Sequence, residues 1–131
     1  MRDLVNSKKG VAIRGYDPVA YFTMHQAVEG DPRYSHHWNG AVWHFASSEH
    51  RDLFVAEPEH YAPQYGGYCA WAMSKGSLAG INPKAWHIED NRLFLNYNAR
   101  LNRRFLKDLP TRIREADQNW PLVRERLSAA S

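Results

Sequence analysis

The chain has 131 residues, a mass of 15.2 kDa and hydrophobic residues at 44% of its positions. This size and composition predict one folded domain with a modest core, and they exclude an intrinsically disordered chain. The sequence contains no apolar stretch of membrane-spanning length and does not open on a signal-peptide apolar segment, so we expect a soluble domain.

The formal net charge of +3 is distributed unevenly along the chain. Residues 99–127 contain eight Lys or Arg against four Asp or Glu, a net of +4, which leaves −1 for the rest. A basic helix there could meet nucleic acid or anionic lipid, but a solvated face with interspersed acids is the preferred explanation. Because no Lys/Arg run, RNA-binding signature or zinc-finger spacing is present, we expect no nucleic-acid partner.

The amino-terminal part predicts an irregular polar segment over residues 1–10, followed by one domain over residues 11–127. Val11 to Ile13 has the composition of a short strand. Asp17 and Pro18 then predict the start of a helix, since Asp is a good N-cap acceptor and Pro suits the first helical position. A helix cap is therefore favoured over a catalytic acid for Asp17.

A β-hairpin is predicted around Asn39-Gly40, with strands over Tyr34–Trp38 and Ala41–Phe45. This dipeptide is a strong hairpin signal because a type I′ turn needs positive φ at both central residues. Alternation along the second strand predicts two faces, with Trp43 and Phe45 on one and Val42 and His44 on the other.

Ser47 has the character of an N-cap for a helix that runs to about Ala56 and is ended by Pro58. Leu53 and Phe54 are expected to form the buried stripe of this helix. A turn-rich connection follows before the next periodic segment.

The second half of the chain predicts further helices and a second hairpin. A helix over Cys69–Met73 is expected to end near Gly76, and strands over Trp86–Glu89 and Leu93–Tyr97 flank Asp90-Asn91. Two helices follow, over residues 99–108 and from Pro110 to about Asn119. The spacing of Leu101 with Phe105 and of Ile113 with Ala116 predicts docking of both helices onto the sheet. The fold class expected is α+β, a single domain of short antiparallel strands packed with several helices.

Four segments carry a resemblance to a known family. They are G-Y-D-P-V-A-Y-F at Gly15–Phe22, F-A-S-S-E-H at Phe45–His50, Y-A-P-Q-Y-G-G-Y-C-A at Tyr61–Ala70 and A-D-Q-N-W-P at Ala116–Pro121. The chain resembles the YHS domain family, with a core over residues 15–68 and a helical extension over residues 99–127. It is similar nearly end to end to the stand-alone small proteins of that family. The resemblance implies a module associated with metal handling.

The resemblance also shows where metal ligands have been lost. The metal-binding members of the family carry cysteines at the positions of Ala20, Ala46 and His50. Alanine cannot ligate, so a structural zinc required for folding is not expected. A copper or zinc site would need Cys69 and His50, with His37 and His44 joining if their faces agree. Copper is preferred because it suits mixed thiolate and imidazole ligands, and because the family often accompanies copper transport.

Each of these residues also has a structural explanation. Cys69 could be a ligand or a thiolate activated at a helix amino end, or a small buried residue beneath Gly66 and Gly67. The imidazole of His50 could ligate or simply form hydrogen bonds across the core, and the other histidines could serve packing or lie on the surface. Three aromatic residues around the glycines could line a small ligand cleft or belong to the core: Tyr61, Tyr65 and Tyr68.

Three functions therefore stay open. The first is a non-enzymatic binding protein that holds copper or zinc in a cysteine and histidine cleft. The second is a small-ligand or protein-interaction module that has lost the ancestral metal site. The third is a Cys69-dependent enzyme or thiol redox sensor. Many stand-alone relatives carry an export signal, so the resemblance implies a periplasmic protein if a signal has been removed and a cytoplasmic one otherwise.

Overall fold

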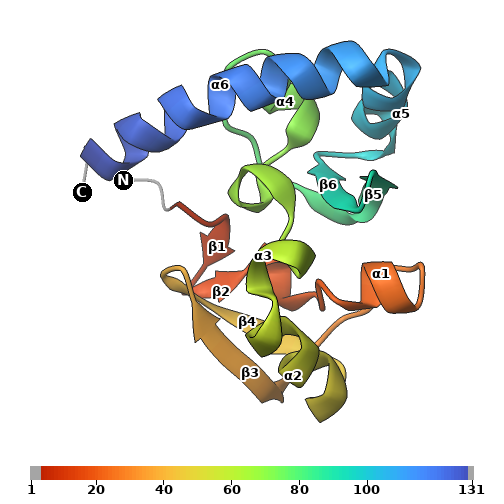
Figure 1. The fold of residues 1–131 in the computed structure, drawn as a ribbon, viewed down its shortest axis with the longest axis vertical. Coiled ribbons are helices and arrows are strands. Elements are labelled where there is room, and N and C mark those ends of the chain that lie inside the picture. Colours follow the sequence, from red (N-terminus) through yellow and green to blue (C-terminus); the bar gives the residue numbers. More distant parts are fainter. Residues whose placement is uncertain (1–3, 130–131) are drawn as a thin grey trace.

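The first half of the chain builds a four-stranded sheet with the order β1-β2-β4-β3, in the lower part of Figure 1. The computed structural model describes residues 4–129. The strands are β1 (Ser7–Lys8), β2 (Val11–Ala12), β3 (Asp31–Trp38) and β4 (Ala41–Phe45). The hairpin of β3 and β4 is confirmed, and its turn residues Asn39 and Gly40 have φ values of 53° and 82°.

The amino-terminal segment takes part in this sheet. Residues 7 and 8 of the stretch expected to be irregular form β1, and residues 1–3 of that stretch lie outside the described residues. The predicted strand over residues 11–13 is shorter than expected, because β2 ends at Ala12 and the chain enters a 3-10 turn at Ile13–Gly15 (η1). β2 pairs with β4 in parallel, so the sheet is not purely antiparallel.

Three short helices belong to this half: α1 (Ala20–Thr23), α2 (Ser48–Ala56) and α3 (Pro58–Tyr61). Of these, α2 packs on β3 and β4, and α3 contacts α2. The predicted cap of α2 is confirmed, since the Ser47 hydroxyl accepts a hydrogen bond from the His50 N–H at 3.1 Å. Phe54 is fully buried, but the prediction for Leu53 is wrong because this side chain is 42% exposed. Consecutive residues point about 100° apart around a helix, and α2 turns its Phe54 side to the core, which leaves Leu53 at the exposed margin of the buried stripe.

The second half contains a two-stranded sheet and three helices. These are β5 (Asn82–Glu89), β6 (Arg92–Asn96), α4 (Ala70–Ser74), α5 (Ala99–Lys107) and α6 (Leu109–Ala129), preceded by a 3-10 segment, η2 (Gln64–Gly67). The second hairpin is confirmed, and Asp90 and Asn91 at its turn have φ values of 52° and 61°. Gly76 follows α4 with a φ of 78°, as expected for a residue that ends a helix.

The carboxyl-terminal helix differs most from the sequence prediction. It was expected to end near Asn119, but α6 continues through Pro121 to Ala129. Proline removes one backbone donor from the helix, yet Val123 and Leu127 are buried on the same side beyond it. α5 packs on β5 and β6 as predicted, whereas α6 packs mainly on α4 rather than on a sheet.

Strand β6 joins two clusters of buried side chains into one domain. Leu93 and Leu95 belong to the cluster around Trp43, while Phe94 belongs to the cluster that includes Phe105 of α5. Alternate residues of a strand point to opposite faces, so β6 serves both clusters at once. The expected α+β fold in a single domain is therefore confirmed.

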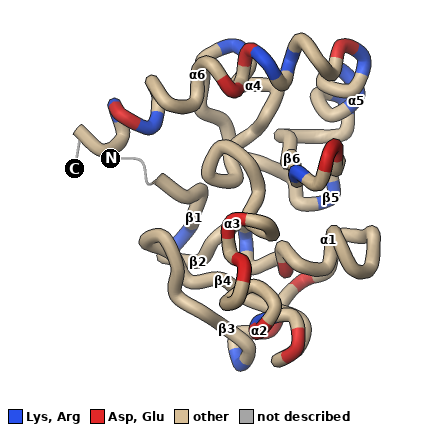
Figure 2. Tube along the Cα trace, in the orientation of Figure 1, with Lys and Arg blue, Asp and Glu red and all other residues tan. Residues whose placement is uncertain are grey.

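The polar surface follows the mixed charge pattern of the sequence. Figure 2 shows basic and acidic residues interspersed along α5 and α6. None of the helices within residues 4–129 combines the length and the apolar character needed to cross a bilayer.

Candidate functional site: an aromatic cavity between two halves

The three positions at which the resemblance places cysteines meet at the carboxylate of Asp17. Its Oδ1 accepts hydrogen bonds from the N–H groups of Val19 at 2.8 Å and Ala20 at 3.2 Å. Its Oδ2 accepts from the N–H of Ala46 at 2.8 Å and lies 2.6 Å from Nδ1 of His50. Asp17 is fully buried. Asp17 therefore accepts from the backbone as a capping side chain does, although α1 begins at Ala20 rather than directly after Asp17. It also ties α1 to β4 and α2.

Both ring nitrogens of His50 have partners. Nδ1 contacts Asp17, and Nε2 lies 3.0 Å from the Thr23 hydroxyl at the end of α1. A metal ion could bind this imidazole only by displacing one of these contacts. The arrangement corresponds to the structural alternative, in which the imidazole forms hydrogen bonds across the core.

Cys69 lies in a different part of the molecule, at the start of α4, and is fully buried. Its thiol donates to Oδ1 of Asn96 at 3.5 Å and accepts from the N–H of Tyr97 at 3.3 Å. Burial raises the pKa of the Cys69 thiol, and this outweighs the hydrogen bonds that favour the thiolate. α4 has only five residues, so the effect of its amino end on the thiol pKa is smaller than the effect of burial.

The two strand histidines do not face His50. In an antiparallel pair, residues opposite each other share a face. His37 is opposite Val42 and therefore lies on the face of His44, whereas His36 is opposite Trp43 and its ring lies 6.4 Å from Phe54 of α2. Since α2 covers the Trp43 face, the condition under which His37 and His44 would join His50, a shared face, is not met.

Cys69 does not join these histidines either. α4 lies in the upper part of Figure 1 and α2 in the lower part, so Cys69 and His50 belong to opposite halves. Within the described range, no three His, Cys, Asp or Glu side chains are grouped so that they could hold a metal ion.

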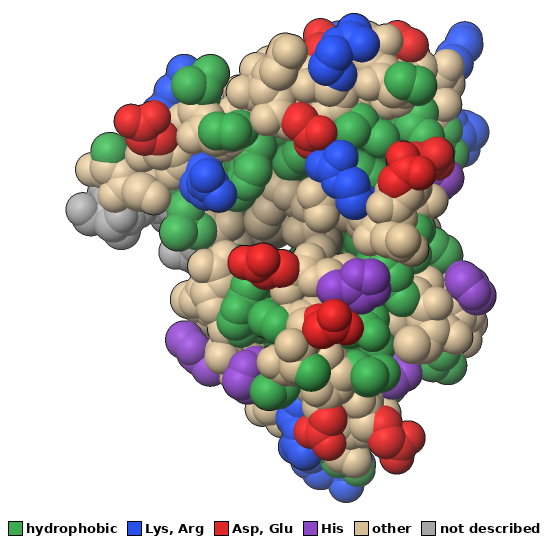
Figure 3. Space-filling view, in the orientation of Figure 1, with side chains coloured by type: hydrophobic (Ala, Val, Ile, Leu, Met, Phe, Trp, Pro, Cys, Tyr) green, Lys and Arg blue, Asp and Glu red, His purple; other side chains and the backbone are tan. Residues whose placement is uncertain are grey.

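The three predicted cleft tyrosines also separate. Tyr61 packs edge-on against Phe22 with ring centroids 5.5 Å apart, and Tyr68 is buried in the core. Tyr65 alone of the three lines the cavity of about 450 Å³ that lies between the two halves. The molecule is visibly hollowed there in Figure 3.

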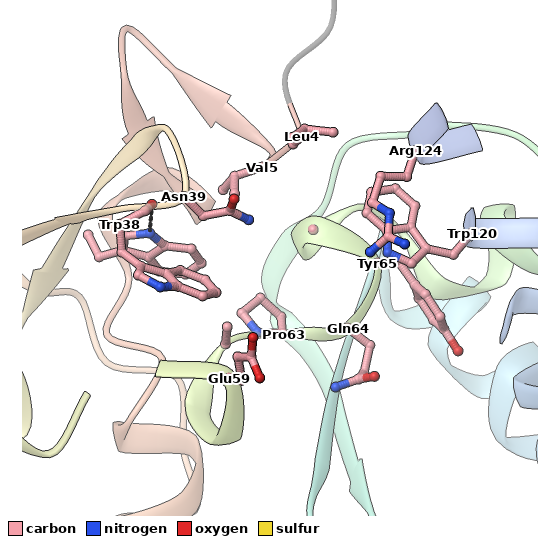
Figure 4. A pocket seen from close by; sticks show the side chains of 13 residues that line it. Leu4, Val5, Trp38, Asn39, Glu59, Pro63, Gln64, Tyr65, Trp120 and Arg124 are labelled. Carbon is pink, nitrogen blue, oxygen red and sulfur yellow. Dashed lines mark hydrogen bonds between the residues drawn. The ribbon is translucent and has the colours of Figure 1, made fainter. Parts of the chain in front are cut away.

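Four aromatic side chains and four polar ones dominate the lining of this cavity. Figure 4 shows Trp38 and Asn39 from the sheet half on one side, and Trp120 and Arg124 from α6 on the other. The remaining wall comes from the amino-terminal segment, from β4, and from α3 with the connection that follows it. The lining residues are Leu4, Val5, Trp38, Asn39, Trp43, Glu59, Ala62, Pro63, Gln64, Tyr65, Gly66, Trp120 and Arg124.

Gly66 explains how the amino-terminal segment comes to border the cavity. Its φ is +65°, and a Cβ there would lie 2.1 Å from the carbonyl oxygen of Leu4 and 3.2 Å from Trp120. The Gly66 carbonyl also accepts a hydrogen bond from the N–H of Asn6 at 2.8 Å. The close backbone approach expected of the glycines therefore does occur, and it seats the segment before β1.

A hydrogen-bond network fixes part of the wall. The Tyr65 hydroxyl donates to Asp117 at 2.8 Å, and Arg92 bonds both Asp117 at 2.6 Å and the Gln64 side-chain oxygen at 3.0 Å. Burial, followed by the contact with Asp117, raises the pKa of Tyr65, so its hydroxyl stays protonated. The side chains of Tyr65 and Gln64 are thus held in place by contacts within the protein.

Glu59 and Arg124 differ from this fixed wall. Neither forms an ion pair with another residue of the described segment 4–129. Both are exposed at the cavity, Glu59 from α3 and Arg124 from α6. A carboxylate and a guanidinium are therefore available to a ligand from different elements.

The sequence gives little warning of this cavity. Trp38, Trp43 and Trp120 show no common spacing in the sequence that would bring them together. No known protein family, curated protein or solved structure matches the chain at a significant level. The interpretation of the site therefore depends on its own residues.

Proposed function

We propose that this protein is a non-enzymatic binding protein for a small organic ligand, which it holds in the cavity between its two halves. The observation that carries the proposal is the meeting of three tryptophans, from β3, β4 and α6, around about 450 Å³ of space. Small-molecule sites are typically cavities of about 300–1,000 Å³ with aromatic walls and a few polar groups.

The lining defines the chemistry of the ligand. Indole and phenol rings pack well against flat apolar faces, so a planar ring system suits Trp38, Tyr65 and Trp120. Arg124 can pair with a carboxylate or a sulfonate on the ligand, and Glu59 can pair with an amine. We therefore expect a ring-bearing molecule that carries at least one charged group.

Binding is favoured over catalysis by the placement of the reactive groups. Cys69 is buried, and the effect of that burial is to keep its thiol protonated, which argues for a packing residue rather than a nucleophile. Asp17 and His50 are engaged with each other and with the backbone, and none of the three lines the cavity. The thiol-dependent enzyme or redox sensor is therefore the least supported alternative.

Transition-metal binding remains a second hypothesis, motivated by the resemblance to the YHS domain family. The geometry gives it less support, because Asp17 and His50 supply only two candidate ligands and Cys69 lies elsewhere. Copper and zinc content after loading and dialysis should be compared between the wild type, Cys69→Ser and His50→Ala. Equal content in all three proteins would remove the cysteine and histidine site.

The small-ligand proposal is tested by titrating two probes, indole-3-acetate and tryptamine, while recording indole N–H resonances by NMR. We expect saturable shifts of the Trp38 and Trp120 resonances with at least one probe. Trp120→Ala should reduce the affinity at least about tenfold, since a stacked aromatic wall is removed. Trp71→Ala is the matched control, because Trp71 is also half-buried but lies on α4 outside the cavity.

The charged residues sharpen the same experiment. Arg124→Gln should weaken the binding of indole-3-acetate more than that of tryptamine, and Glu59→Gln should weaken the binding of tryptamine more. If neither probe shifts the cavity resonances at millimolar concentration, or if Trp71→Ala weakens binding as much as Trp120→Ala, the proposal is wrong.

A further inference from the structure

A second, larger cavity of about 650 Å³ opens beside the four-stranded sheet, and all four strands contribute to its lining. It lies where the turn between β1 and β2, the η1 turn and the approach to β3 come together over β4. Its lining residues are Lys8, Lys9, Val11, Arg14, Gly15, Glu29, Gly30, Pro32 and His44. It shares no lining residue with the aromatic cavity.

The charge of this cavity is predominantly positive. Lys8, Lys9 and Arg14 face a single lining carboxylate, Glu29. None of these four groups forms an ion pair with any residue in the range 4–129. Three cations and one carboxylate therefore line one space, and none of the four is held in an ion pair.

The nearby Asp31 does not neutralise them. Asp31 interacts with His44 electrostatically, but its carboxylate is engaged by Arg33, at 2.8 Å from Nη2 and 3.1 Å from Nε. This pairing engages the charge of Asp31, so Glu29 is the one lining carboxylate that an entering anion meets beside the two lysines and Arg14.

An unusual backbone turn presents Arg14. Ile13, Arg14 and Gly15 have φ values of 40°, 58° and 77°, and left-handed conformations are strained for a β-branched residue. The turn is held because the Ile13 side chain is fully buried and its N–H donates to the Asn6 carbonyl at 2.9 Å. Such strain persists where the surrounding structure enforces it, and it is concentrated at functional sites.

Two glycines leave room for His44 at the floor of the cavity. A Cβ on Gly30 would lie 2.6 Å from the His44 carbonyl carbon, and a Cβ on Gly15 would lie 3.2 Å from His44 Nδ1. The His44 ring has no hydrogen bond to another residue in the part of the chain described here. A ring nitrogen is thus available beside the three cations.

From this arrangement we infer that the cavity binds the phosphate group of a small phosphorylated molecule. A phosphate accepts several charge-assisted hydrogen bonds at once, and the fork-shaped guanidinium of Arg14 matches two of its oxygens. The volume exceeds that of a phosphate ion, which leaves space for the group that carries it. Three cations gathered at one open cavity suit a small phosphorylated molecule better than a nucleic-acid strand, which needs an extended basic stripe.

The test is an NMR titration of the full chain with inorganic phosphate, against sodium chloride at equal ionic strength. The binding variant is Lys8→Gln/Lys9→Asn/Arg14→Asn, in which Asn replaces the two residues with φ values of 53° and 58° because Asn tolerates that conformation. The matched control, Lys84→Gln/Arg103→Gln/Arg114→Gln, removes the same charge from exposed positions outside the cavity.

We expect saturable shifts around Arg14 and His44 with phosphate, at least about tenfold weaker binding in the cavity variant, and unchanged binding in the control. A thermal unfolding curve establishes that each variant is folded, and Lys8→Gln alone replaces the triple variant if that variant does not fold. No saturable shift with phosphate, or equal weakening in variant and control, would overturn the proposal. Binding of a 12-nucleotide single strand without binding of phosphate would overturn it in favour of a nucleic-acid surface.

Discussion

Two buried polar networks, one in each half of the molecule, differ in the kind of acceptor at their centre. In the sheet half, the Asp17 carboxylate accepts three backbone N–H groups and contacts His50. In the helical half, the neutral amide of Asn96 accepts from the N–H of Trp71 at 2.9 Å and donates to Asn102 at 2.8 Å. Both central residues are fully buried.

The difference indicates how each network contributes to stability. Hydrogen bonds to a carboxylate are about twice as strong as those between neutral groups. Asp17 also has more donors than Asn96, and those donors are backbone groups that cannot rearrange freely. The two residues singled out as metal ligands, His50 and Cys69, are peripheral members of these two separate networks.

The largest effect is expected for Asp17→Ala. The substitution leaves three backbone N–H groups without an acceptor in a buried place, which should lower the free energy of unfolding by roughly 3–5 kcal/mol. Urea denaturation monitored by circular dichroism measures this change. Asp52→Ala on the exposed side of α2 is the control, and a loss no larger than that of the control would contradict the proposed role.

Asn96→Ala should have the next largest effect. Trp71 loses its acceptor and Asn102 loses a donor, so a decrease of about 2–3 kcal/mol in the free energy of unfolding is expected. A double-mutant cycle with Asn102→Ala should give a combined loss smaller than the sum, because the two side chains share a hydrogen bond. Strict additivity would show that they act independently.

His50→Ala should lower the free energy of unfolding by less than Asp17→Ala or Asn96→Ala, by about 1–2 kcal/mol. Asp17 keeps its three backbone donors, and only the contacts of the ring with Asp17 and Thr23 are lost. The same unfolding experiment on Thr23→Val isolates the second contact. If His50→Ala destabilises the protein as much as Asp17→Ala, the imidazole rather than the carboxylate organises this network.

The smallest effect concerns Cys69 and depends on pH. Burial raises the pKa of its thiol above the ordinary value of 9.0, so the folded state holds this proton more tightly than the unfolded state. The resulting stabilisation is fully present below that value and is lost as the pH rises through the folded-state pKa. The stability of the wild type relative to Cys69→Ala should therefore fall above about pH 9.

Comparing the wild type with Cys69→Ala also cancels the contributions of other groups that titrate at alkaline pH. Burial raises the pKa values of Tyr21 and Tyr65 as well, but both proteins contain these residues, so their contributions cancel in the difference. Urea unfolding of both proteins at a series of pH values provides the measurement. A difference that stays constant into the alkaline range would show that the thiol is not desolvated.

Local features were predicted well because their causes are local. The Asn39-Gly40 and Asp90-Asn91 turns follow from backbone preferences of the residues themselves, and the Ser47 cap follows from a side chain that reaches its own helix. The end of α6 was misplaced because Pro121 is a local signal that the packing of Val123 and Leu127 outweighs. Leu53 was misplaced because spacing does not specify which side of α2 meets the sheet.

Most residues of the aromatic cavity could not be predicted from local sequence signals. Tyr65 was identified as a candidate from the adjoining glycines, but Tyr61 and Tyr68 share that neighbourhood and point elsewhere. Trp38 and Trp120 lie 82 positions apart in the sequence, and nothing in their surroundings links them. The position of Lys8, Lys9 and Arg14 around His44 likewise depends on the parallel pairing of β2 with β4.

The amino-acid sequence by itself determined the α+β class, both hairpins and the caps of individual helices, since each depends on interactions between residues close in the chain. Tertiary structure alone decided which side chains share a cavity, and it placed Cys69 and His50 in separate halves. The physical reason is that a site is made by contacts between distant segments, and those contacts are set by how whole faces of sheets and helices pack.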